Sequence, residues 1–208
     1  GKEGDTILSS NAYGRGWVPT GKQNDDKWTA VDFDDSGWKR GRNGAGYERE
    51  RGFQSLISKA FDFNAEMYNK SESLYLRFPF NIDDLDRVVS SSDLVLRMKY
   101  DDGFVAYLNG HKVASSNAPE NPQWNSKAVS GHNDPEAMRF EPISISEHRN
   151  RLRIGKNVLA IHGLNIDSAS TDMLIVAEIQ TNDYDYEQAI GELVDLDSFY
   201  IFWAMEGL

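Results

Sequence analysis

Residues 94–115 read LVLRMKYDDGFVAYLNGHKVAS, and this stretch decides the fold. From Leu94 to Tyr100 an apolar side chain stands at every second position, which is the period of a strand with one buried face. Asp101-Asp102-Gly103 is a turn sequence, and residues 104–108 form a second apolar run. Asn109-Gly110 then predicts a hairpin, because a type I′ turn needs positive φ at both central residues. The stretch therefore predicts three consecutive strands.

The same pattern extends outward in both directions. Residues 73–80 alternate in the same way, and residues 139–145, 157–163 and 172–180 are further predicted strands. The last two are rich in Val, Ile and Leu, which indicates burial on both faces. Helical periodicity is missing from these segments, so residues 1–181 are predicted to form an all-β domain, an antiparallel β-sandwich of the jelly-roll type. Residues 48–54 and 118–136 are long polar loops, a feature typical of binding segments.

The last stretch, residues 182–208, has a different pattern. Asp195 or Asp197 is a suitable N-cap, and the run from Phe199 to Met205 is apolar nearly all round. We therefore predict a short C-terminal helical tail whose apolar surface is covered by a following domain. Because the first residue is Gly1 and not Met, we expect the chain to be a piece of a longer protein that has lost any export signal.

Composition excludes several classes of function. The 208 residues carry a net charge of -11, with a pI of about 4.8, which disfavours binding to nucleic acid. The basic runs at residues 39–42 and 149–153 are interpreted as solvated surface. The chain has no cysteine, so disulfides and thiolate chemistry are ruled out. No apolar run reaches the roughly 18 residues that span a bilayer.

Catalytic and metal motifs are also missing. The four histidines lack metal-type spacing, and His162, in an apolar strand, is expected to be a core residue. The doublets Asp34-Asp35 and Asp101-Asp102 are interpreted as turn residues, with a structural calcium site as the alternative. No P-loop or nucleophile elbow is present. The sequence therefore predicts no enzyme activity, no cofactor and no identified metal ligands.

Aromatic side chains near polar groups suit sugar binding, because a ring stacks on the apolar face of a pyranose while polar groups bond its hydroxyls. The two long loops supply the predicted ligand-binding residues, with Glu48 beside them. Trp17, Trp28 and Trp38 are interpreted as packing residues, whereas Trp124 suits packing and ligand contact equally. The predicted ligand-binding residues are Tyr47, Arg49, Trp124, Asn125, His132 and Asn133.

Three motifs in order resemble galactose-binding-like jelly rolls of bacterial carbohydrate-active and surface proteins. They are FDDSGW with GAGY at residues 33–38 and 44–47, YDDGF with YLNG at residues 100–110, and GKNVLAIHGLN with STDM at residues 155–173. The resemblance covers residues 15–181 and implies a carbohydrate ligand and an extracytoplasmic, bacterial location.

The tail, LVDLDSFY with FWAMEGL, resembles a helix of the spore-coat protein H (CotH) kinase family. CotH-like proteins carry jelly rolls of this kind beside the CotH domain, which implies that residues 182–208 begin such a domain. No residue here matches that family's nucleotide or metal ligands. Two functions are therefore expected: an accessory carbohydrate-binding module of a larger exported protein, or a docking domain that braces a neighbouring CotH-like domain and binds no sugar.

Overall fold

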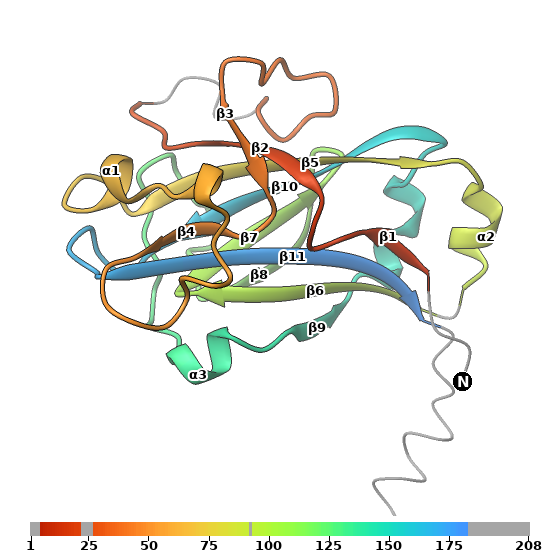
Figure 1. The fold of residues 1–208 in the computed structure, drawn as a ribbon. Helices are drawn as coiled ribbons and strands as arrows, with labels where there is room; N and C mark the ends of the chain where they lie inside the picture. The colour runs from red at the N-terminus through yellow and green to blue at the C-terminus, as the bar shows by residue number, and fades with distance from the viewer. Residues whose placement is uncertain (1–4, 22–26, 92, 183–208) are drawn as a thin grey trace, which may run out of the picture.

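The computed structural model describes residues 5–21, 27–91 and 93–182, which form two antiparallel sheets packed face to face (Figure 1). One sheet has six strands in the order β3-β2-β5-β10-β7-β8. The other has five, in the order β1-β11-β6-β9 with β4 also paired to β11. The strands are β1 (Thr6–Leu8), β2 (Tyr13–Trp17), β3 (Lys39–Arg42), β4 (Ala45–Glu48), β5 (Ser73–Ile82), β6 (Asp93–Asp101), β7 (Gly103–Leu108), β8 (His111–Ser116), β9 (Glu141–Ser144), β10 (Gly155–Leu164) and β11 (Asp172–Asn182). The predicted antiparallel β-sandwich is confirmed.

The core lies between the sheets and follows the predicted alternation. Leu74, Leu76 and Phe78 of β5 are completely buried, and they belong to the same apolar cluster as Leu96 of β6 and Ile161 of β10. The short helical pieces lie at the ends of strands. They are η1 (Lys59–Phe61), α1 (Asn64–Met67), α2 (Leu85–Val89), α3 (Asp134–Ala137) and η2 (Ser146–Arg151). Burial of alternate apolar side chains is therefore what closes the two sheets on each other.

The two turns of the opening stretch differ in kind. Asn109 and Gly110 have φ of 51° and 89°, and they join β7 to β8 as the predicted hairpin. Asp102 instead joins β6 in the five-stranded sheet to β7 in the six-stranded sheet, so it is a corner between the two layers. Its backbone N–H donates to the Leu164 carbonyl at 3.1 Å.

Strands β2 and β3 were not predicted, because their inward positions are glycines. Strand β4 was not predicted either, since it has only four residues. A Cβ on Gly14 would lie 2.5 Å from the Phe78 ring, and one on Gly41 would lie 2.3 Å from the Phe61 ring. Neighbouring aromatic rings fill the space that apolar side chains would otherwise take, so no apolar alternation is left in the sequence. The basic run at residues 39–42, interpreted as solvated surface, is β3, where Arg40 and Arg42 are exposed.

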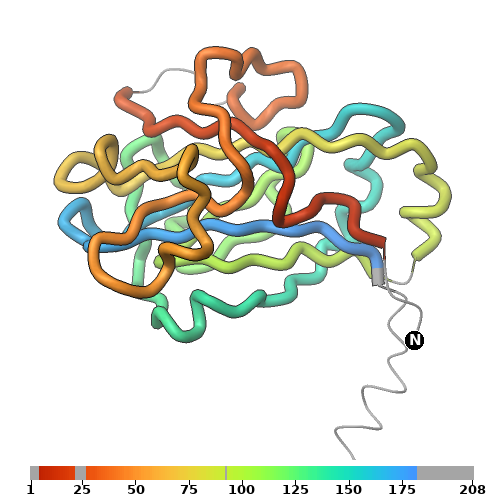
Figure 2. Tube along the Cα trace, in the orientation of Figure 1, coloured from red at the N-terminus to blue at the C-terminus, as the bar shows by residue number. Residues whose placement is uncertain are grey.

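Two loops cover the outer face of the five-stranded sheet. Phe53, from the loop after β4, packs on Leu174 and Val176 of β11, and Phe140, before β9, joins the same cluster. Figure 2 shows the loop after β4 running in front of the β11 strand. Both faces of β11 are consequently buried, as predicted.

Residues 183–208 lie outside the described residues, and the predicted helical tail falls among them. Among the residues that are described, no helix is long and apolar enough to cross a bilayer.

Candidate functional site

The six residues predicted to bind a ligand do not converge on one place. Tyr47 was expected on a loop, but it lies in β4 and is completely buried. Its hydroxyl donates to the Ser170 carbonyl at 2.9 Å and accepts from the Asn165 amide at 3.1 Å. Burial raises the pKa of the Tyr47 phenol above its usual range. The expectation of an exposed Tyr47 ring was wrong, because this side chain packs in the core and ties the β10–β11 loop to β4.

Arg49 is exposed at the end of β4. Its guanidinium lies 3.8 Å from the centre of the Tyr68 ring, and its Nη1 donates to Asn64 Oδ1 at 3.2 Å. These contacts hold the side chain beside α1.

His132 is held at the corner between the sheets. Its ring stacks on Tyr100 with ring centres 4.3 Å apart, and its Nε2 lies 3.0 Å from Glu141 Oε1. Its backbone N–H donates to Asp102 Oδ1 at 3.0 Å. Asn125 and Asn133, on the same loop, are exposed. His132 therefore anchors the loop through contacts that use most of its polar atoms.

The buried corner contains the most perturbed acid in the described residues. Burial, and then the neighbouring Asp102 and Asp172 carboxylates, raise the pKa of Asp101 to about 9. Asp102 accepts backbone hydrogen bonds from His132 and from Ile166, the latter at 2.8 Å. Two loops are thus fastened to one carboxylate. The doublet was interpreted as turn residues, and in the structure it makes the corner between β6 and β7.

The other doublet makes the predicted turn. Asp34 Oδ1 accepts the backbone N–H of Ser36 at 3.0 Å. No three His, Asp or Glu side chains come together as a metal site in the described part of the chain.

His162 is a satisfied core residue, as predicted. It is buried, and its Nε2 lies 2.8 Å from Ser73 Oγ. Burial lowers its pKa to about 3, which keeps the imidazole neutral.

An aromatic layer covers the outer face of the six-stranded sheet. Trp28 is buried and stacks on Tyr75 with ring centres 4.0 Å apart, and Trp17 and Trp38 lie beside them with ring centres 5.6 Å apart. The layer consists of Trp17, Trp28, Phe33, Trp38, Tyr75, Tyr107 and Trp124. Packing of Trp17, Trp28 and Trp38 is confirmed, and the structure shows that Trp124 packs on the same layer while remaining partly exposed.

Arg77 fixes the segment that carries this layer. Its side chain is 2% exposed, and its Nε lies 2.7 Å from Asp35 Oδ2. The guanidinium also donates to the carbonyls of Trp28 and Ala30, the second at 2.8 Å. Residues 28–35 are therefore held against the sheet by one buried cation, because each of these acceptors would otherwise lose its partner.

A pocket of about 420 Å³ opens beside Trp17. Lys39 Nζ lies 2.5 Å from Glu66 Oε1 and donates to the Asp62 carbonyl at 2.9 Å, while Lys70 Nζ donates to the Ala65 carbonyl at 2.6 Å. The lining residues are Gly16, Trp17, Val18, Thr20, Lys39, Phe63, Ala65, Glu66 and Lys70. We call this the Trp17 pocket. Sequence reasoning missed it because β2, β3 and α1 are brought together only by the fold.

The Trp17 pocket lacks the groups that glycoside hydrolysis requires. That reaction uses two carboxyl groups on either side of the scissile bond, about 5 to 10 Å apart. Glu66 is the one carboxylate among the lining residues, and it is engaged by Lys39. The arrangement can bind a polar ring, but it offers no acid and base pair.

Fold and pocket together define a β-sandwich domain with a polar, tryptophan-walled cavity. No family model and no curated protein matches the sequence. Among solved structures, the chain is similar to a β-glucuronidase of Bacteroides uniformis, with 12% identity over 84% of this chain and 18% of that chain, and a TM-score of 0.48. An uncultured Clostridium sp. β-glucuronidase gives 12% identity over 87% of this chain and 30% of that one, with a TM-score of 0.48.

A third similar structure is the Bifidobacterium dentium β-glucuronidase complexed with coumarin-3-O-glucuronide. It gives 11% identity over 78% of this chain and 20% of that chain, with a TM-score of 0.47. The chain spans less than a third of the length of each of these three structures. At this identity and TM-score, the similarity assigns neither a family nor an activity to the chain.

Proposed function

We propose that this chain is a non-catalytic carbohydrate-binding module of a larger exported bacterial protein. The observation that carries the proposal is the Trp17 pocket, whose lining combines one partly exposed indole with hydroxyl, ammonium and carboxylate groups. Its volume of about 420 Å³ falls in the range of small-molecule sites. Export and the larger parent protein rest on the resemblance of residues 15–181 to jelly rolls of bacterial surface proteins.

The pocket suits one sugar ring. The indole of Trp17 provides a flat apolar surface for the C–H face of a pyranose. Thr20, Lys39 and Glu66 provide donors and acceptors for its hydroxyl groups, and the Lys39–Glu66 ion pair fixes the positions of two of them. Because the polar groups are already held in place, little side-chain entropy is lost on binding.

The predicted loop residues extend this proposal. Arg49, Trp124, Asn125, His132 and Asn133 stay as proposed contacts to further sugar units of a longer glycan. Trp124 is the strongest of them, because it shares the aromatic layer with Trp17 and is partly exposed. Tyr47 is not among them, since its ring has no exposed surface.

A glycan array tests the proposal with wild type, Trp17→Ala and Trp124→Ala. We expect wild type to bind a subset of glycans, Trp17→Ala to lose that binding, and Trp124→Ala to weaken it for long glycans. Thermal melting checks that both variants are folded. A wild-type chain that binds no glycan would contradict the proposal, and equal binding by Trp17→Ala would place the sugar elsewhere.

A docking role is the second candidate function, and it rests on the sequence of the tail. The run from Phe199 to Met205 contains only apolar and aromatic residues, which favours burial against a partner surface. We propose a neighbouring CotH-like domain as that partner. The sequence of the parent protein beyond Leu208 tests this role, because the absence of a CotH-like continuation would remove its basis.

A further inference from the structure

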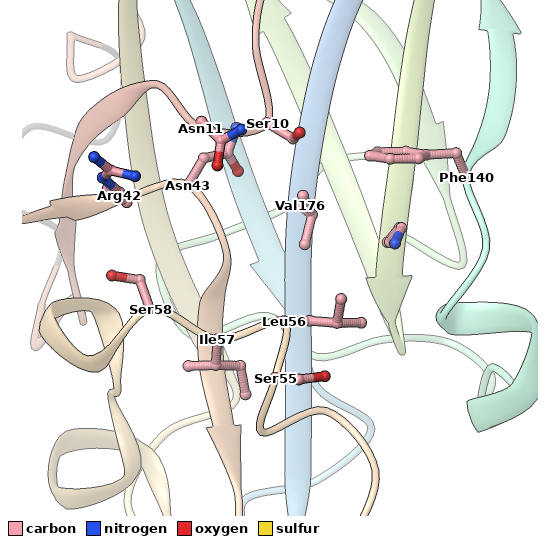
Figure 3. A pocket seen from close by; sticks show the side chains of 11 residues that line it. Ser10, Asn11, Arg42, Asn43, Ser55, Leu56, Ile57, Ser58, Phe140 and Val176 are labelled. Carbon is pink, nitrogen blue, oxygen red and sulfur yellow. The ribbon is translucent and has the colours of Figure 1, made fainter.

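A second pocket lies on the outer face of the five-stranded sheet, opposite the aromatic layer. Its volume is about 330 Å³, and Figure 3 shows Val176 of β11 between Arg42 on one side and Phe140 on the other. The lining residues are Ser10, Asn11, Arg42, Asn43, Ser55, Leu56, Ile57, Ser58, Lys99, Phe140 and Val176. We call this the Arg42 pocket.

The charge of the Arg42 pocket is opposite to that of the chain. Arg42 and Lys99 are its ionisable lining residues, whereas the chain as a whole carries -11. Neither has a carboxylate partner among the described residues. Arg42 Nε donates to the Tyr13 hydroxyl at 3.4 Å, and Lys99 Nζ lies 4.7 Å from the centre of the Phe140 ring.

Arg97, close to Lys99 in sequence, differs from the two pocket cations because it has a carboxylate partner. Arg97 precedes Lys99 by two residues and so shares its face of β6, but Arg97 Nη1 lies 2.9 Å from Glu178 Oε2. Arg97 is therefore neutralised by Glu178. Arg42 and Lys99, which line the pocket, are left to interact with solvent or a ligand. Two unpaired cations in a concave site attract an anion.

Neutral groups in the same pocket match a sugar. No hydrogen bond within the described chain occupies the side chains of Ser10, Asn11, Ser55 or Ser58, so their polar atoms are free to meet hydroxyl groups. Figure 3 shows Ser10 and Asn11 above Val176 and Ser55 below it, next to Leu56. Apolar surface flanked by donors and acceptors is the arrangement that binds a pyranose ring.

Asn43 has a different role from the other lining residues. Its side chain donates to the Ala177 carbonyl at 2.7 Å and accepts the backbone N–H of Gly44 at 2.9 Å. These bonds fasten the β3–β4 connection to β11, which keeps Arg42 beside the pocket.

We propose that the Arg42 pocket binds an anionic saccharide, whose carboxylate or sulfate groups meet Arg42 on one side of Val176 and Lys99 on the other. The hydroxyl groups of the sugar meet the serines and Asn11, and its C–H face lies on Val176 and Phe140. The site is separate from the Trp17 pocket, because no residue lines both, although β3 supplies Arg42 to one and Lys39 to the other. The inference stands whether or not the Trp17 pocket binds a neutral sugar.

Isothermal titration calorimetry tests the proposal with three probes: oligogalacturonate, a sulfated galacto-oligosaccharide and the neutral galacto-oligosaccharide of equal length. We expect at least one anionic probe to bind more tightly than the neutral one, with affinity falling as salt increases. Arg42→Gln and Lys99→Gln are each expected to weaken that binding about tenfold to a hundredfold, the effect of losing one charged hydrogen bond. The preferred anionic probe identifies the acidic group.

Two control variants separate this site from general charge and from the other pocket. Lys112→Gln removes an exposed cation of β8, which does not line the pocket, and is expected to leave binding unchanged. Trp17→Ala is likewise expected to bind the anionic probe with the affinity of the wild type. The proposal is overturned if neither anionic probe binds, if Arg42→Gln and Lys99→Gln bind as wild type does, or if Lys112→Gln loses as much affinity as they do. Equal binding of a polyglutamate peptide would also overturn it, since any anion would then suffice.

Discussion

Replacing Asp101 with Asn should flatten the pH dependence of stability. Asp101 ends β6 and is 3% exposed, and burial raises its pKa to about 9. In the unfolded chain an Asp has a pKa of about 4. Between these two values the folded protein holds a proton that the unfolded chain has released. Stability contributed by this group is therefore complete at low pH and is lost as the pH rises toward 9.

The magnitude follows from proton linkage. One extra proton bound by the folded state lowers the free energy of unfolding by about 1.4 kcal/mol for each pH unit of increase. Asp172, whose pKa burial raises to about 6, adds a second proton over the lower part of the range. Above pH 6, Asp101 contributes more than Asp172 to the change of unfolding free energy with pH.

The amide that Asp101→Asn introduces has no such proton to lose. It stays neutral at every pH and, like a protonated carboxyl, can both donate and accept a hydrogen bond. We therefore expect the variant to match the wild type near pH 4 and to be more stable at pH 8, by on the order of a few kcal/mol. The slope between pH 6 and pH 9 should largely disappear.

Urea unfolding at intervals from pH 4 to pH 9 measures this directly. Asp32→Asn is the matched control, because it makes the same chemical change at an exposed position. Parallel stability curves for wild type and Asp101→Asn would refute the reasoning. A wild-type stability that rises from pH 6 to pH 9 would do the same.

Three further outcomes are expected. Arg77→Met should lower the free energy of unfolding by about 3–5 kcal/mol in urea titrations, because it leaves Asp35 and buried carbonyls without their donor. A loss below about 1 kcal/mol would argue against the anchoring role. Gly46→Ala should lower the melting temperature, since Gly46 has φ of 140° and a Cβ there would lie 1.9 Å from the Met173 carbonyl oxygen. Gly37→Ala is the control and should leave the melting temperature unchanged, because a Cβ at Gly37 meets nothing within 4 Å. A metal chelator should leave the melting temperature unchanged, because no three carboxylate or histidine side chains gather as a metal site in the described ranges; a clear decrease would indicate a structural calcium ion.

The strands from β5 to β11 could be predicted because their signal is local. Alternation of apolar residues and the Asn109-Gly110 turn depend on neighbouring residues alone, and both are confirmed in the structure. The early strands gave no such signal. At Gly14, Gly16 and Gly41 the inward side chain is replaced by an aromatic ring from another segment, so the packing partner is visible only in three dimensions.

The sequence by itself determined the sandwich and the absence of catalytic motifs, since periodicity and motif spacing are properties of short segments. Tertiary structure alone decided which polar residues are available to a ligand. It buried Tyr47 in β4, paired Arg97 with Glu178 across 81 positions of sequence, and left Lys99 and Arg42 lining one pocket. The physical reason is that burial and ion pairing depend on which strands become neighbours. The order of residues along the chain does not by itself show which side chains will meet.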